Sequence, residues 1–219
     1  MAFGCTEIWS LHAQEVSETP LDPLQQAIVH IEQLKQGVLI VRLPSFRNQL
    51  RALDNRRNAA KQQQELLEDR EHFARQIISA FRDTFRFCQT LYTYDTAMTL
   101  ISEGQRSGFL LDDSLLVVNP DIAIPKGMPV YTLRLGITNY EITTRRTAFI
   151  FTDHQGNDLD KPFPFARSIF FLEPLNLKRM FGSSNFYQTM DARWARQIIG
   201  NIQARLVHFA GQVSAPGDG

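Results

Sequence analysis

Six residues, Val38–Leu43, form a largely apolar, β-branched run between Gly37 and Pro44. A short run of this kind without polar alternation is typical of a strand that is covered on both faces. Strands covered in this way occur in sheets whose connecting helices pack on them. The run therefore predicts a layered α/β architecture with Val38–Leu43 as a central strand.

A helix is predicted directly before this strand. Asp22 can cap its start, and Pro23 takes the first helical position, where the missing N–H costs nothing. Gly37 is expected to end the helix in a left-handed conformation. The apolar residues recur every three or four positions and predict one buried stripe, which consists of Leu24, Ile28, Ile31 and Leu34.

Two further helical regions are indicated. Residues 46–87 are long, charged and rich in helix formers, and a polar middle at 54–58 fits either two helices or one kinked helix. A last helix is expected after Asp191, a candidate N-cap. Its apolar residues recur at four-residue steps and should face the core: Trp194, Ile198, Ile202 and Leu206.

The second half of the chain is predicted to be mainly β. Strands are expected at residues 91–94, 109–118, 128–138, 146–152 and 168–173, with a short helix over 96–102 capped by Asp95. The stretches 128–138 and 146–152 should lie nearer a sheet edge. The predicted fold class is α/β to α+β, with a mixed sheet, early parallel strands, late antiparallel strands and helices on at least one face. A thioredoxin-like fold runs in a similar order, although no CxxC pair is present.

One globular domain is expected over residues 21–211, which suits a chain of 219 residues. Residues 1–20 show no structural period and predict a flexible leader or a remnant of a secretory signal, and residues 212–219 predict a disordered tail. Hydrophobic residues make up 43% and charged residues 21%, which excludes wholesale disorder and a polytopic membrane protein. We expect a soluble chain without a transmembrane segment.

Charge limits the classes of partner. Twenty-three Lys and Arg residues balance twenty-three Asp and Glu residues, so no nucleic-acid partner is expected. Two basic clusters can still bind an anionic group, namely Arg134 with Arg145–Arg146, and Lys178–Arg179 near Phe181. A homo-oligomer is compatible with the sequence.

Three side chains near predicted strand ends are the candidate catalytic residues: Asp95, Asp113 and His154. Asp112–Ser114 is also typical of a β-turn and residues 153–158 of a hairpin turn, which gives these positions a purely structural interpretation. No P-loop, dinucleotide fingerprint, nucleophile elbow or HExxH motif occurs. The histidines and the two cysteines lack ligand spacing, so neither a metal nor a cofactor is predicted. Cys88 is expected to be a small buried hydrophobe.

Prolines and phenylalanines alternate in Lys161–Phe165. Pro162 and Pro164 stiffen the backbone and remove two N–H donors, which keeps the segment out of a central sheet. The segment can line an apolar cleft for a ligand or partner, or it can buttress the core. For the cleft hypothesis we expect Phe163 to be the exposed ring and Phe165 the buried one.

Several of these segments together resemble a family of uncharacterised bacterial proteins. The resemblance spans about residues 25–175 and is carried by residues 37–43, 80–88, 109–115 and 161–164. Members of that family look like secreted or envelope-associated proteins to which no activity, cofactor or catalytic residue is assigned. The resemblance therefore implies a periplasmic or envelope location rather than a cytoplasmic one.

Two functions remain open at this point. The favoured one is a non-catalytic binding or structural protein of the bacterial envelope, because no catalytic motif appears. The alternative is a small hydrolase or transferase with a carboxylate and histidine site at strand ends. Convergence of Asp95, Asp113 and His154 in one pocket would favour the enzyme.

Overall fold

The computed structural model describes residues 22–54, 58–138, 146–169 and 191–214. They build one mixed five-stranded sheet with the strand order β2-β1-β3-β4-β5. β1, β2 and β3 run parallel, and β4 runs antiparallel to both of its neighbours. This confirms the predicted mixed α/β fold with early parallel and late antiparallel strands. The strands are β1 (Val38–Leu43), β2 (Gln89–Tyr94), β3 (Val130–Thr138), β4 (Arg146–Thr152) and β5 (Ala166–Ser168).

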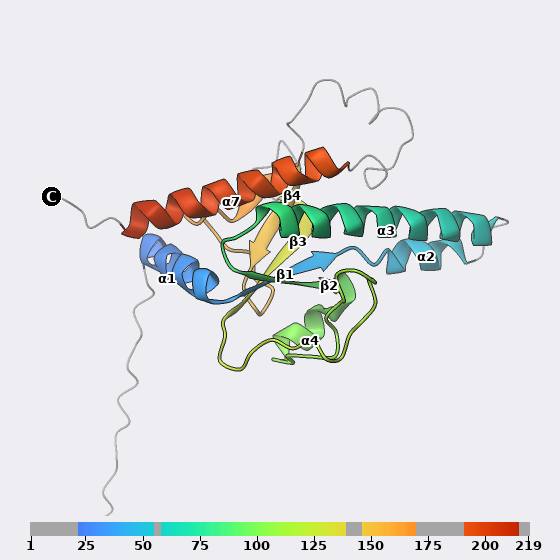
Figure 1. The fold of residues 1–219 in the computed structure, drawn as a ribbon, viewed down its shortest axis with the longest axis horizontal. Helices are drawn as coiled ribbons and strands as arrows, with labels where there is room; N and C mark the ends of the chain where they lie inside the picture. Colours follow the sequence, from blue (N-terminus) through green and yellow to red (C-terminus); the bar gives the residue numbers. More distant parts are fainter. Residues whose placement is uncertain (1–21, 55–57, 139–145, 170–190, 215–219) are drawn as a thin grey trace, which may run out of the picture.

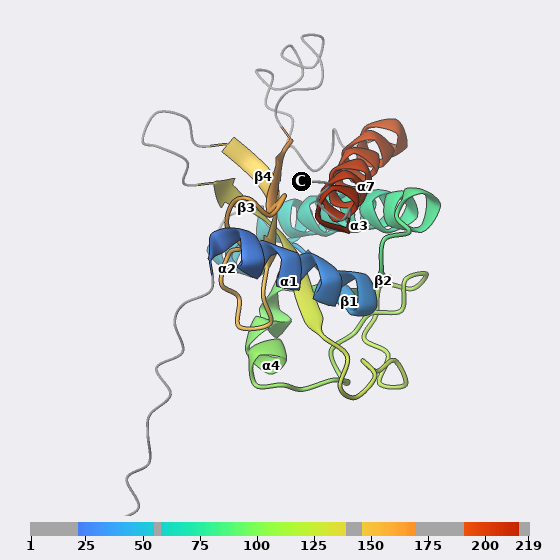
Figure 2. The same ribbon diagram turned by 90° about the vertical axis from the view of Figure 1, so that its left-hand side faces the viewer.

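Helices pack on both faces of the sheet. The long helices lie side by side on one face and a short one on the other (Figures 1 and 2). The first face carries α1 (Pro23–Gln36), α3 (Ala59–Thr84) and α7 (Ala192–Ser214), whose side chains share a core with Leu39 and Val41. The second face carries the 3₁₀ turn η1 (Asp95–Ala97) and α4 (Met98–Ser102), packed near Val38 and Ile40. The burial of β1 on both faces agrees with its apolar sequence.

β3, and not β1, is the middle strand of the sheet. The edges are β2 and β5, so the prediction that residues 128–138 and 146–152 lie near an edge is wrong for 128–138. β3 alternates polar and apolar residues, a pattern that is typical of a strand with one exposed face, but in β3 it has another cause. Thr132 is fully buried, and its hydroxyl lies 2.6 Å from that of Thr152 on β4. A buried hydroxyl is tolerated when it is hydrogen-bonded, so polar residues alternate here without an exposed face.

The ends of α1 form partly as predicted. Asp22 Oδ2 accepts a hydrogen bond from Leu24 N at 3.2 Å, and Pro23 is the first helical residue. Gly37 follows the helix with φ −102°, so the expected left-handed conformation is wrong. The glycine has a different role there, because a Cβ at this position would lie 2.5 Å from Pro129 O. The close approach lets Val38 N donate to the same oxygen at 2.9 Å.

Residues 46–87 contain two helices, α2 (Arg47–Leu53) and α3. Buried side chains in α3 begin only at Phe73, and α2 has none. Figure 1 shows α2 beside the first half of α3, where the pair extends past the end of the sheet. The charged composition of this region therefore reflects a paired helical arm.

Residues 109–118 do not form the predicted strand. The segment makes only an isolated bridge between Leu111 and Val118, and Gly108 and Leu116 have φ of +83° and +59°. Phe109, Leu110 and Leu111 are nevertheless buried. Their apolar character reflects burial in an irregular loop, which local sequence does not distinguish from a strand.

The C-terminal helix confirms its predicted cap and buried stripe. Trp194 N donates to Asp191 Oδ1 at 2.7 Å, and Ile198, Ile202 and Leu206 are buried. The helix continues to Ser214, so residues 212–214 belong to it and not to a tail. β5 ends at Ser168, where a strand was predicted to begin, while residues 1–20 and 170–173 lie outside the described residues. In the described ranges, no helix is both long and apolar enough to cross a bilayer.

Candidate functional site: a pocket at the carboxyl ends of β1 and β3

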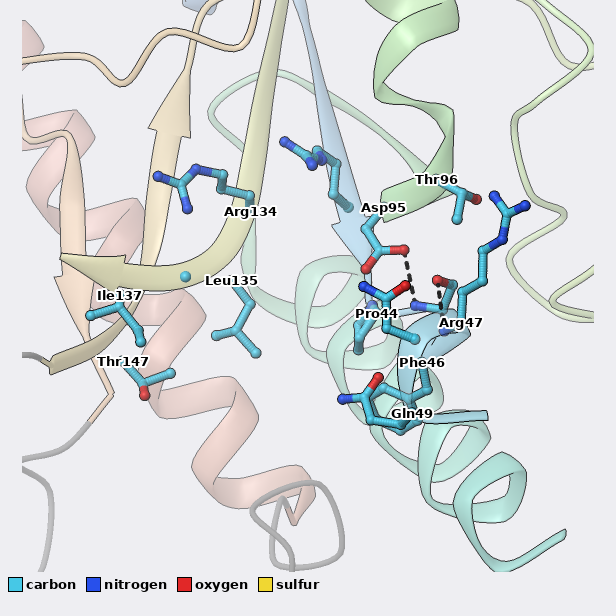
Figure 3. A pocket seen from close by; sticks show the side chains of 14 residues that line it. Pro44, Phe46, Arg47, Gln49, Asp95, Thr96, Arg134, Leu135, Ile137 and Thr147 are labelled. Atoms are coloured by element: carbon cyan, nitrogen blue, oxygen red, sulfur yellow. Dashed lines mark hydrogen bonds between the residues drawn. The ribbon is translucent and has the colours of Figure 1, made fainter. Parts of the chain in front are cut away.

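A pocket of about 640 Å³ opens at the carboxyl ends of β1 and β3 (Figure 3). One wall is the end of β3 together with Thr147 of β4, and the other is the turn from Pro44 into α2. Asp95 and Thr96, which follow β2, complete the lining. The lining residues are Arg42, Pro44, Ser45, Phe46, Arg47, Asn48, Gln49, Asp95, Thr96, Arg134, Leu135, Gly136, Ile137 and Thr147.

The sheet topology explains why a pocket forms here. From β1 the chain returns through α3 to β2 on one side, whereas from β3 it passes to β4 on the other side. Neighbouring parallel strands whose connections leave in opposite directions create a crevice outside their carboxyl ends, and α/β proteins bind ligands in such crevices. The pocket therefore occupies the place where this architecture favours a site.

The strand register deepens this crevice into a notch. The last residue pair between β1 and β3 is Arg42 with Arg134. β3 continues for four more residues, 135–138, whose register partners are on β4. Because β1 turns away at Pro44, the edge of β3 that faces away from β4 borders the pocket over these residues.

Two arginines lie directly opposite each other at the inner end of the notch. Arg42 and Arg134 are register partners, and neighbouring partners in a sheet project to the same face. Like charges in this arrangement repel and destabilise the pairing of the strands. Both side chains line the pocket. An anion between them would remove the repulsion.

Asp158 partly compensates Arg134. The carboxylate accepts from Arg134 Nε at 3.1 Å and from Nη2 at 2.7 and 2.6 Å. Nη1 makes no hydrogen bond within the described residues, and it lies over Gly136, where any Cβ would overlap it. Gly136 thus provides the space that lets the guanidinium extend along β3 toward the pocket.

Arg42 has no hydrogen-bond partner among the described residues, and its Nε is buried. Burial and, next, the charge of Arg134 lower the pKa of Arg42, while Asp95 and Asp158 act in the opposite direction. A guanidinium keeps its charge even when its pKa falls. A buried donor without a partner costs about 1–3 kcal/mol. Arg42 is therefore a charged residue of the pocket lining whose guanidinium makes no hydrogen bond within the described residues.

The turn after β1 shapes the opposite wall. Phe46 is buried and has φ +57° and ψ +19°, a left-handed conformation that is strained for a bulky residue. The turn brings Ser45 N to within 3.1 Å of Asp95 Oδ1, and Arg47 N donates to Ser45 Oγ at 3.4 Å, as Figure 3 shows. The expected role of Asp95 as a helix cap is wrong, because its carboxylate makes no capping bond and binds this turn.

The predicted catalytic residues do not share the pocket. Asp95 lines it, whereas Asp113 and His154 are exposed and do not. No hydrogen bond or ion pair joins any two of the three, all of which the structure describes. Asp113 accepts a bond from Ser114 Oγ at 3.3 Å. Sequence reasoning grouped them by their position in or beside predicted strands. Residues 109–118 form no strand, however, and β4 runs antiparallel to β3, so His154 follows β4 at the end of the sheet opposite to the pocket.

Both turn interpretations hold for the surrounding segments. Asp112 Oδ1 accepts from Ser114 N and Leu115 N, each at 2.9 Å, and these bonds lower the pKa of Asp112. Asp153 Oδ1 accepts from Gln155 N and Asn157 N at 2.9 Å. These aspartates act as local turn formers, a common use of Asp side chains.

The proline-rich segment buttresses the core. Phe163 is 1% exposed and makes edge-to-face contacts with His30, Phe151 and Phe209, whereas Phe165 is half-buried. The assignment of Phe163 as the exposed ring and Phe165 as the buried one is therefore wrong. Pro162, which follows a cis peptide bond, and Pro164 do not line the pocket either.

The described residues contain no group of three His, Cys, Asp or Glu side chains able to hold a metal ion. Cys88 packs beside the main core, and burial raises the pKa of its thiol to about 12, which fits the predicted small hydrophobe. Cys5 lies outside the described residues.

Sequence reasoning found part of this site. Arg134 was recognised as an anion-binding candidate. Arg42 was not, because it lies within the largely apolar run that predicts β1 and was interpreted only as part of that strand. Of the residues grouped with Arg134, Arg145 and the side chain of Arg146 lie outside what the structure describes, as does the second basic cluster, Lys178–Arg179. The overlooked signal was a single charged residue near the carboxyl end of an otherwise apolar central strand.

Comparisons with known proteins add no assignment. No protein-family model, curated protein or solved structure matches this chain. The resemblance to uncharacterised bacterial proteins therefore stays a prediction.

Proposed function

We propose that this protein is a non-catalytic binding protein whose ligand carries an anionic group, bound between Arg42 and Arg134. The observation that carries the proposal is the Arg42 guanidinium, which lines a pocket of about 640 Å³ without a hydrogen-bond partner and with its Nε buried. Pockets of about 300–1,000 Å³ at strand-end crevices are typical small-ligand sites.

The charges around the pocket fit an anion. Three arginines, Arg42, Arg47 and Arg134, oppose two aspartates, Asp95 and Asp158, which leaves a local charge of +1. Asp158 already binds Arg134 on two nitrogens, and Asp95 already accepts from Ser45 N. Arg42 and Arg47 thus keep guanidinium groups without a carboxylate partner among the described residues, and Arg42 is the less exposed of the two.

A binding role is preferred over catalysis for a geometric reason. A general acid or base must lie within hydrogen-bond reach of the proton that it transfers, so a shared site of Asp95, Asp113 and His154 needs all three beside one substrate. Of the three predicted catalytic residues, only Asp95 borders the pocket. An envelope location remains part of the proposal only through the sequence resemblance, and it needs its own test.

The test is thermal unfolding in sodium acetate and in sodium phosphate, each compared with sodium chloride at the same ionic strength. At 50 mM anion and a Kd of about 1 mM, binding to the folded state adds about 2.3 kcal/mol. For a chain of this size that corresponds to a rise in Tm of roughly 5–9 °C. We expect the rise with at least one of the two anions.

Arg42→Gln should abolish the rise. Arg193→Gln is the matched control, because Arg193 is exposed on α7 and does not line the pocket. An equal anion effect in wild type and Arg42→Gln would refute the proposal.

A further inference from the structure

We infer that the ligand of this pocket is an α-amino acid, whose carboxylate binds Arg42 and Arg134 and whose ammonium group binds Asp95. This inference rests on the proposed function and names the chemical class of its ligand. Three features support it: the order of the charges across the sheet, the second oxygen of Asp95 and the charge balance of the lining.

Positive and negative side chains lie on different sides of the pocket. Arg42 on β1 has two register partners, Arg134 on β3 and Thr93 on β2. Asp95 comes two residues after Thr93, so its backbone lies on the β2 side, about 7 Å further toward the carboxyl ends of the strands. Both arginines and Asp95 line the pocket. A ligand between them meets two cations on one side and a carboxylate on the other.

The carboxylate of Asp95 keeps one oxygen for a cation. Oδ1 accepts from Ser45 N at 3.1 Å, whereas Oδ2 makes no hydrogen bond within the described residues. Figure 3 shows this second oxygen on the side of the pocket where Arg134 and Leu135 lie. In the described part of the chain, no ion pair joins Asp95 to an arginine of the lining. A ligand that carries both charges can bridge this gap.

The charges at the inner end of the pocket balance. Asp158 pairs with Arg134 at 2.6 Å, which leaves Arg42 and Asp95 as one charge of each sign, while Arg47 is exposed to solvent. A simple carboxylate beside Arg42 would repel Asp95.

An α-amino acid carries an ammonium group with three donors and a carboxylate that accepts from two guanidinium groups. It therefore satisfies both sides of the pocket without adding net charge. The volume of about 640 Å³ leaves room for a side chain as well.

The experiment compares two matched sets of probes by NMR titration of the protein at pH 7. One set is L-alanine, propanoate and ethylamine, and the other is L-leucine, 4-methylpentanoate and 3-methylbutylamine. Within a set, the second probe lacks the ammonium group and the third lacks the carboxylate. In at least one set we expect the amino acid to bind at least fivefold more tightly than either analogue, because only it makes both charge-assisted contacts.

Asp95→Asn tests the ammonium site. Asparagine keeps an oxygen that can accept from Ser45 N, so the turn after β1 is retained. The advantage of the amino acid over its carboxylate analogue should fall below twofold, and the carboxylate analogue itself should bind at least as tightly as it does to wild type. Asp121→Asn is the matched control, because Asp121 is exposed and does not line the pocket. Arg42→Gln should abolish binding of the amino acid and of the carboxylate alike.

The outcomes separate the two proposals. If in both sets the amino acid binds no more tightly than its carboxylate or amine analogue, the amino-acid inference is overturned, and this comparison needs no variant. An unchanged advantage in Asp95→Asn would overturn it too. In either case, carboxylate binding that requires Arg42 would still support the anion-binding function. If none of the probes, acetate or phosphate shows Arg42-dependent binding, both proposals fail.

Discussion

Replacing Arg42 by methionine should make the ligand-free protein more stable. Methionine keeps the length of the buried aliphatic part but removes the charge and the unpaired donor. The buried Nε of Arg42 has no partner, and such a group costs about 1–3 kcal/mol. Removing the like-charge pair with Arg134 should add about 0.2–1 kcal/mol. Loss of the attraction to Asp95 and Asp158 offsets part of this gain.

We therefore expect a net gain of about 1–2 kcal/mol in the free energy of unfolding, combined with loss of anion binding. Equilibrium urea denaturation measures it, with Arg193→Met as the matched control on an exposed position. A second variant, Asp158→Asn, frees Arg134 and should destabilise wild type by about 1 kcal/mol but the Arg42→Met protein by less. A loss of more than about 1 kcal/mol in Arg42→Met would show that Arg42 supports the fold, and the reasoning about an unsatisfied binding group would be wrong.

Three other predictions address separate parts of the chain. Gly136→Ala should displace the Arg134 guanidinium, because a Cβ at this position overlaps Nη1. The Kd of the anion, measured from its effect on thermal unfolding, should rise at least threefold, and an unchanged Kd would contradict this prediction. In urea titrations Phe163→Ala should cost about 3–5 kcal/mol and Phe165→Ala clearly less, because only the first ring is fully buried; equal losses would argue against this packing. Deleting residues 1–20 should shift the Tm by less than about 2 °C, and cell fractionation of the intact gene product tests the envelope prediction, which an uncleaved, purely cytosolic protein would refute.

The elements that the sequence predicted well are those whose pattern depends on local contacts. The caps at Asp22 and Asp191 formed as expected because a cap involves only the next three residues. The buried stripe of α7 followed from its helical periodicity, and strand β1 followed from its apolar run between Gly37 and Pro44. In each case one side chain and its near neighbours carry enough information.

The errors arose where distant segments decide the outcome. Gly37 is required by the carbonyl of Pro129, more than ninety positions away, so its φ could not be inferred from the end of a helix. From the sequence, Thr132 is expected to be exposed, because its hydrogen-bond partner Thr152, which makes its burial possible, is twenty positions away. Phe163 was assigned to a cleft because nothing in residues 161–165 reveals that His30 and Phe209 cover it.

The site itself depends on the same distant information. Arg42 and Arg134 are ninety-two positions apart and become neighbours only through the register of β1 and β3. The register also decides that the pairing of β3 with β1 stops four residues before the end of β3, which opens the notch beside the two charges. A shift of one residue would turn one arginine to the other face of the sheet, because side chains alternate along a strand. The hydrophobic faces of β1 and β3 fix that register, with Leu39, Val41 and Leu133 in one core. The packing that folds the sheet therefore also holds two like charges together, and a bound anion is the simplest way to lower the energy of that arrangement.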